Sequence, residues 1–127
     1  MVELTYSVFE LGQLRHPICE VLDYPELSDY FSTALPRTKC GILRTINACR
    51  RISDGSIEEF DAPGSESHVV KISRSLVLID RYFHPDAADP DAPVHFEIPF
   101  DVFFDALSQW AVYVRRFERS QVRNDRG

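Results

Sequence analysis

The sequence predicts an α+β fold: a single domain over residues 1–127 whose helices pack mainly on one face of an antiparallel sheet. Two stretches carry this prediction. Residues 69–98 include three runs rich in apolar and β-branched side chains, which favour strands. Residues 100–117 have apolar side chains three and four positions apart, which is the period of a helix. A chain of 127 residues, 44% of them hydrophobic, suits one core.

The best-defined element is the final strand–helix unit. A strand is predicted over 94–98, with alternate apolar side chains on one face: Val94, Phe96 and Ile98. Pro99 ends this strand and fits the first turn of a helix, where its missing N–H costs nothing. The apolar stripe of the helix consists of Phe100, Phe103, Phe104, Leu107, Trp110 or Ala111, Val114 and Phe117. We interpret Trp110 as a core anchor, with an interface hot spot as the alternative. A frayed tail is expected over about 120–127.

A hairpin and a loop are predicted before that unit. Strands over 69–73 and 76–83 are separated by a short link, so they pair as a hairpin. Residues 84–93 contain three prolines and three aspartates, which favour a loop. With the strand over 94–98, these elements predict a meander in the C-terminal half.

The first third of the chain gives weaker patterns. A strand is predicted over 2–9, and His16-Pro17 is interpreted as the start of a short helical turn. Asp23 and Glu26 have the spacing of a capping box, which favours a helix near 25–35 that ends before Pro36.

A second helix is predicted to begin at Thr38. Its buried stripe consists of Ile42, Leu43, Ile46, Cys49 and Ile52. A short strand is expected over 57–60 and a loop over 62–65.

The net charge of −6 makes nucleic acid and anionic membranes unfavourable direct partners and favours a basic protein partner. Cys19, Cys40 and Cys49 lack the spacing of a zinc site and are interpreted as core thiols. The sequence shows neither the pattern of a signal peptide nor an uncharged apolar run of the ~18 residues that span a bilayer. We therefore expect a soluble protein of the reducing cytoplasm.

Acidic residues occur in blocks. Residues 54–67 contain five acids and residues 84–105 contain six, and neither block contains a Lys or Arg. Such blocks are either solvated faces that complement basic blocks elsewhere, or an acidic face that steers a basic partner. The candidate partner-binding residues are Glu58, Glu59, Asp61, Asp86, Asp89 and Asp91.

No motif indicates a reaction. Metal-type ligands gather at His84, Asp86, Asp89, Asp91 and His95, but their spacing does not match an EF-hand. Cys19 and His16 are a possible nucleophile–base pair without a supporting signature. No nucleophile elbow or phosphate-binding glycine loop is present in the sequence. We expect no catalytic residues, no metal and no cofactor, with a small metal-dependent enzyme that uses the His84–His95 region as the alternative.

Residues 68–117 resemble the C-terminal half of small bacterial immunity proteins of polymorphic or contact-dependent growth inhibition toxin systems. The shared features are the strand order, the strand that ends in Ile98-Pro99, and the helix with Leu107 and Trp110 that follows. The resemblance implies a cytoplasmic, non-enzymatic protein. Such a protein binds a cognate toxin, often a nuclease, and covers its active site or substrate cleft. A non-enzymatic adaptor or ligand-binding subunit is a further alternative.

Overall fold

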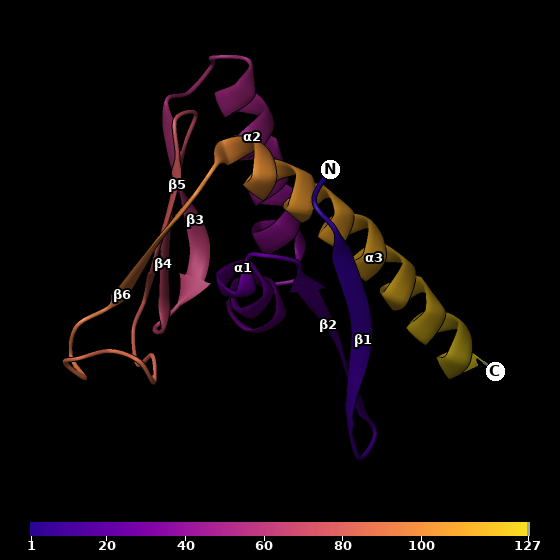
Figure 1. Cartoon of the computed structure of the whole chain (residues 1–127). Coiled ribbons are helices and arrows are strands. Elements are labelled where there is room, and N and C mark those ends of the chain that lie inside the picture. The colour runs from indigo at the N-terminus through magenta and orange to yellow at the C-terminus, as the bar shows by residue number, and fades with distance from the viewer. Residues whose placement is uncertain (127) are drawn as a thin grey trace.

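The computed structural model describes residues 1–126, except for the side chains of Lys39 and residues 122–126. Within these residues the chain forms two antiparallel sheets and several helices (Figure 1). The first sheet is a hairpin of β1 (Leu4–Leu11) and β2 (Leu14–Val21). The second has the order β3-β4-β5-β6 and consists of β3 (Glu59–Ser65), β4 (His68–Ser73), β5 (Val77–Arg81) and β6 (Val94–Ile98). The α+β class and the C-terminal meander are confirmed.

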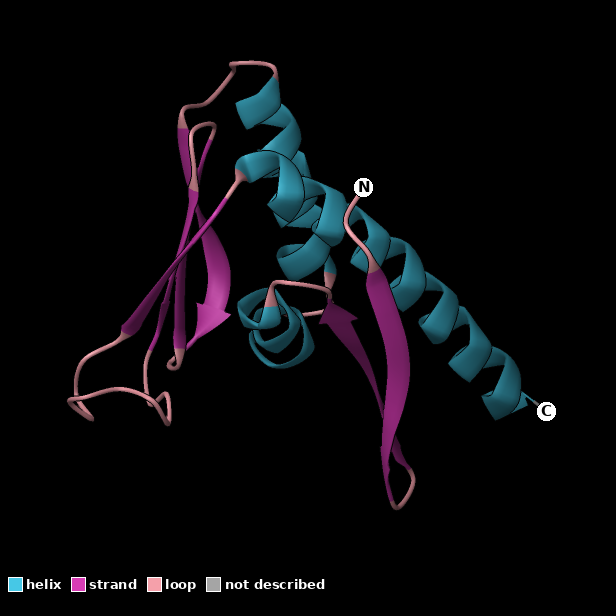
Figure 2. Ribbon diagram, in the orientation of Figure 1, coloured by secondary structure: helices cyan, strands magenta, loops and turns pink. Residues whose placement is uncertain are grey.

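The helices lie on one side of the four-stranded sheet, as Figure 2 shows. The helical segments are α1 (Pro25–Asp29), a π-helical turn (Tyr30–Ala34), a second π-helical turn (Lys39–Leu43), α2 (Arg44–Ser53) and α3 (Phe100–Arg126). The β1–β2 hairpin packs beside α3, and its tip extends away from the rest of the molecule (Figure 1). None of the described helices combines the length and apolarity needed to cross a bilayer.

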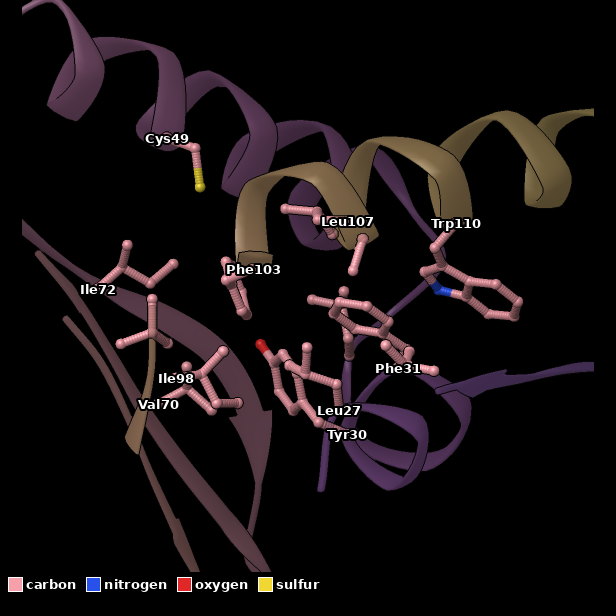
Figure 3. Close-up of a cluster of buried hydrophobic side chains, with 14 of the residues drawn as sticks. Leu27, Tyr30, Phe31, Cys49, Val70, Ile72, Ile98, Phe103, Leu107 and Trp110 are labelled. Carbon is pink, nitrogen blue, oxygen red and sulfur yellow. The ribbon is translucent and has the colours of Figure 1, made fainter. Parts of the chain in front are cut away.

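The core lies between the inner face of this sheet and the helices. Strand alternation places Val70 opposite Ile79, and Ile72 opposite Val77, on the buried face. The helices contribute Leu27, Tyr30, Phe31, Phe103, Leu107 and Trp110 to the same buried cluster, with Trp110 on the side away from the four-stranded sheet (Figure 3). Trp110 is fully buried, which confirms its interpretation as a core anchor. Burial of each such side chain stabilises the fold by about 1.5–3 kcal/mol.

The predicted helical turn at His16-Pro17 is wrong, because residues 14–21 form β2. Among the described residues β2 pairs only with β1, around a two-residue turn in which Gly12 adopts φ 61°. A strand with a free edge tolerates Pro17, whose missing N–H need not pair with a neighbour. Pro17 is therefore compatible with β2, although the sequence around it resembles the start of a helix.

The capping box is also wrong, although the helix is present. Asp23 adopts φ 70°, Tyr24 precedes α1, and no side chain caps that helix. The helical segment continues through the first π-helical turn to Ala34, which matches the predicted extent before Pro36.

The predicted loop over 62–65 belongs to β3. This edge strand has a register shift between Ala62 and Ser65, which accommodates Pro63. Gly64 is needed there because an added Cβ would lie 2.5 Å from the carbonyl oxygen of His68.

Three further expectations differ from the structure. Leu43 is half exposed instead of buried with the rest of its stripe. Cys40 is exposed, whereas Cys19 and Cys49 are buried as expected. The structure continues α3 through most of the predicted frayed tail, as far as Arg126, and Gly127 lies outside the described residues.

Candidate functional site

A buried polar network joins α1 to the end of the four-stranded sheet. His68 on β4 lies opposite Arg81 on β5, on the inner face. His68 Nε2 lies 2.7 Å from Asp29 Oδ2 at the end of α1, and Arg81 Nε donates to the same oxygen at 2.8 Å. The network therefore holds together three elements that are 39 and 52 residues apart in sequence.

Burial favours the neutral form of the His68 imidazole in this network. Its side chain is 1% exposed, and burial lowers its pKa, although the hydrogen bond to Asp29 opposes that shift. A neutral ring satisfies both neighbours if Nε2–H donates to Asp29 while Nδ1 accepts from the Ser67 hydroxyl at 2.8 Å.

Ser67, His68 and Asp29 are the residue types of a nucleophilic triad, but their arrangement suits a structural role. We call the network of Asp29, Ser67, His68 and Arg81 the lock. A general base must reach the proton that it removes. His68 is almost inaccessible, Arg81 shares the carboxylate, and the Ser67 hydroxyl also bonds Ser65 Oγ at 2.8 Å. The network accordingly fixes α1 against the sheet.

Next to this lock the surface contains a cavity of about 460 Å³, which we call the acidic hollow. Its apolar wall includes Ile79, Val94 and Phe96 from β5 and β6, and Pro25 and Pro85. Its carboxylates are Glu26 and Asp29 from α1 and Asp86 from the loop after β5. Its cationic or titratable groups are Arg81, His68 and His84. The hollow thus combines apolar walls with carboxylates from two separate segments.

The carboxylates of the hollow differ in availability. Asp29 is engaged by Arg81 and His68, whereas the side chain of Asp86 is 89% exposed. Among the described side chains, neither Asp86 nor Glu26 pairs with a Lys or Arg. Apolar walls with accessible carboxylates fit the aliphatic stem and charged head of a Lys or Arg side chain.

Phe83 immediately precedes His84, which lines the hollow. Its side chain is 68% exposed, and its backbone adopts φ 59°, the left-handed region that bulky residues rarely occupy. Exposed aromatic rings are frequent anchors of protein interfaces. Strained backbone positions also cluster at functional sites.

All six predicted partner-binding residues are exposed, but they form two separate groups. Glu58, Glu59 and Asp61 lie at or on β3, while Asp86, Asp89 and Asp91 lie in the loop between β5 and β6. The strand order puts β3 and β6 at opposite edges of the sheet. The ammonium of Lys71 lies 3.5 Å from Glu59, and only Asp86 of the six lines the acidic hollow.

Sequence reasoning missed four carboxylates near these groups. Asp80 and Glu97 lie on the outer face of the sheet around His95, whose Nδ1 is 2.5 Å from Asp80 Oδ1. The hydrogen bond to Asp80 raises the pKa of His95. Strand alternation could have identified Asp80 and Glu97 as outward-facing. No sequence signal places Glu26 and Asp29 beside the loop after β5.

The residues proposed for chemistry are not brought together. His84 packs near Phe96 on the inner side of β6, and His95 points to the outer face. The described residues include no group of three His, Cys, Asp or Glu side chains that could hold a metal. Burial raises the pKa of Cys19 to about 12, and His16 Nε2 bonds the carbonyl of Ser32 instead of that thiol.

Charge is unevenly distributed along the chain. Residues 54–105, which include the four-stranded sheet, contain twelve acids and three Lys or Arg, whereas the rest of the chain contains eight acids and eleven Lys or Arg. No protein-family model, curated protein or solved structure matches this chain. Function must therefore be inferred from the geometry and charge of the chain itself.

Proposed function

We propose that this chain is a cytoplasmic immunity protein that binds and neutralises a cognate toxin with a basic, nuclease-type active surface. The acidic hollow carries this proposal. It is an open cavity with apolar walls, and its carboxylates Glu26 and Asp86 have no Lys or Arg partner among the described side chains, although His84 Nδ1 lies 3.9 Å from Asp86 Oδ2. These properties suit recognition of a protein that presents Lys or Arg.

The proposed mechanism is competition for the groups that hold a polyanionic substrate. A Lys or Arg of the toxin enters the hollow, where its stem contacts Phe96 and Pro85 and its charged head meets Asp86 and Glu26. The same Lys or Arg is then unable to bind a phosphate. Covering the cleft with the surrounding loop excludes the substrate as well.

Of the two acidic groups, the hollow favours the loop residues Asp86, Asp89 and Asp91 as the principal contact. The loop contributes His84, Pro85 and Asp86 to the cavity, and the exposed Phe83 directly precedes these residues in the chain. Glu59 on β3 already has a basic neighbour in Lys71, so less of its charge is available to a partner. The β3 group would then contribute to steering instead of direct contact.

The test is growth rescue with the toxin domain encoded next to this chain. The chain should restore growth of bacteria that express that domain. Replacing Asp86, Asp89 and Asp91 by Lys should abolish rescue, because each buried charge pair that loses a partner costs about 2–5 kcal/mol. Replacing Glu58, Glu59 and Asp61 by Lys is the matched control and should mainly slow association.

The design separates folding from binding. Asp89 Oδ1 accepts the N–H of Asp91, so a second variant changes only Asp86 and Asp91 and keeps that turn bond. Both loop variants should melt close to the unsubstituted protein. If both triple Lys variants are folded and still protect fully, the acidic mechanism is wrong. A partner that binds tightly but is not toxic would instead indicate an adaptor, and absence of rescue would contradict the immunity proposal itself.

A further inference from the structure

A second surface is an open groove between α3 on one side and α2 with the segment before it on the other. The two helices pack against each other (Figure 1), and the groove has a volume of about 1000 Å³. Side chains at helical spacing line it from both sides, including Ile46 and Arg50 from α2 and Val112 and Arg115 from α3. We call this surface the helix groove.

The floor of the helix groove is apolar and incompletely covered. Ile42 and Ile46 are buried beneath it, whereas Leu43 and Val112 are each 51% exposed. Leu43 belongs to a regular helical stripe whose other members are covered by the core. Part of the apolar stripe is therefore left uncovered by the rest of the chain. Such an uncovered part is expected where a further helix packs.

The rim of the helix groove is basic. Arg37, Arg50 and Arg115 line it, with Glu118 as the acidic member. Among the side chains that the structure describes, none of the three arginines forms an ion pair. Charge complementarity therefore requires an acidic occupant.

We propose that the helix groove binds an amphipathic helix of a partner protein, with an apolar stripe against Leu43 and Val112 and acidic residues on both flanks. Two rows of helical side chains, one from each helix, form a surface against which a third helix can pack. Nucleic acid is less suitable, because phosphate recognition gains nothing from an apolar floor. A symmetric second copy is less suitable too, because it would bring the arginines of both grooves together.

This surface is separate from the acidic hollow, and the inference does not depend on the proposed function. The probe is a designed, fluorescent helix of about 18 residues, above the length at which isolated helices become stable. It carries Leu at i, i+3, i+4 and i+7 and Glu at the flanking positions. Its affinity for the full chain is measured by fluorescence anisotropy.

Paired charge variants make the test specific. Arg50→Glu with Arg115→Glu should weaken binding by at least about tenfold, because both rim charges are reversed. Arg51→Glu with Arg116→Glu changes the same charge on the same two helices at positions that do not line the groove, and should alter the affinity by less than about twofold. Leu43→Glu should weaken binding by about tenfold or more without unfolding the protein, because Leu43 is half exposed.

Several results would overturn the proposal. These are an absence of saturable binding, equal binding of a peptide with Lys in place of every Glu, or equal losses in the two double variants. Sedimentation that shows a dimer dissociated by Leu43→Glu would make a second copy the occupant. A DNA oligonucleotide that binds with the same arginine dependence but ignores Leu43→Glu would make the groove a phosphate surface.

Discussion

The two faces of the four-stranded sheet share one backbone but differ in what covers them. On the inner face, Ile72, Val77 and Ile79 are fully buried under α1 and α3. On the outer face, their neighbours include Lys71 and Asp80, which meet solvent. Strand alternation therefore gives the two faces different roles. Stability depends on the side chains of the inner face, whereas side chains of the outer face meet solvent and tolerate substitution.

The acidic hollow lies at the end of the sheet where the inner face is polar. At the end of β4 and β5 the inner face carries His68 and Arg81 in place of apolar residues, and the cover is α1 with its polar Asp29. Polar groups on a buried face must satisfy one another, so they form the lock. Beside the lock, charged groups at the edge of the inner face remain uncovered, and they line the acidic hollow.

The largest effect is expected from truncating a large side chain in the core that the helices share with the inner face. Trp110→Ala should reduce the free energy of unfolding by about 3–5 kcal/mol, because it empties a fully buried site. Val112→Ala on the same helix is the control and should change it by less than about 0.5 kcal/mol, because Val112 is half exposed. Denaturant titration measures both. A loss below about 1 kcal/mol for Trp110→Ala would contradict its role in the core.

Adjacent positions on β5 test the two faces directly. Ile79→Ala should cost about 2–5 kcal/mol, because Ile79 lies on the inner face. Leu78→Ala, one residue away on the outer face, should cost less than about 1 kcal/mol, because Leu78 is only partly buried. Equal midpoints for the two variants in urea would mean that the outer face is covered in solution.

The lock should make stability depend on pH. The folded protein lowers the pKa of His68 below its ordinary value near 6.5, so the unfolded chain binds this proton more readily. The contribution of a neutral His68 is therefore complete above pH 6.5 and is lost as the pH falls through its folded pKa. At pH 7.5, His68→Leu should cost about 1–3 kcal/mol, since Asp29 and Ser67 lose a partner.

The difference in unfolding free energy between His68→Leu and the unsubstituted protein should shrink between pH 7.5 and 5.5. Comparing the two proteins at each pH cancels the titration of carboxylates that they share. A difference that instead grows on acidification would indicate a protonated His68 paired with Asp29, which is the opposite assignment of charge.

The elements that the sequence predicted correctly are those with a strong period and a local partner. β6 and the buried stripe of α3 follow from alternation and helical spacing within single segments. β2 was missed because Pro17 suggests a helix start when its neighbour β1 is unknown, and β3 was shortened because Pro63 and Gly64 suggest a loop. In both cases a free strand edge made the proline acceptable.

The candidate site was less predictable than the fold. Asp86 could be proposed from its acidic loop, but Asp29 and Arg81 are 52 residues apart and meet only through tertiary structure. A helix and a strand with ordinary charged residues give no local signal for such a contact. His68 was similarly hidden, because one histidine at the start of a strand indicates neither burial nor a carboxylate partner.

The smallest effect on stability, and the clearest separation of folding from binding, is expected at Phe83. Its φ of 59° strains a bulky residue, and Gly adopts this region without strain. Phe83→Gly relieves that strain but makes the unfolded chain more flexible, so the unfolding free energy should change by less than about 1 kcal/mol. The ring is 68% exposed, and so its removal costs the core little.

If Phe83 anchors the partner beside the acidic hollow, the same change should weaken toxin binding by about 2 kcal/mol or more, measured by calorimetry. Phe83→Tyr keeps an aromatic ring and should retain affinity. Unchanged affinity in Phe83→Gly would remove the aromatic from the interface and leave only the carboxylates of the hollow to be tested.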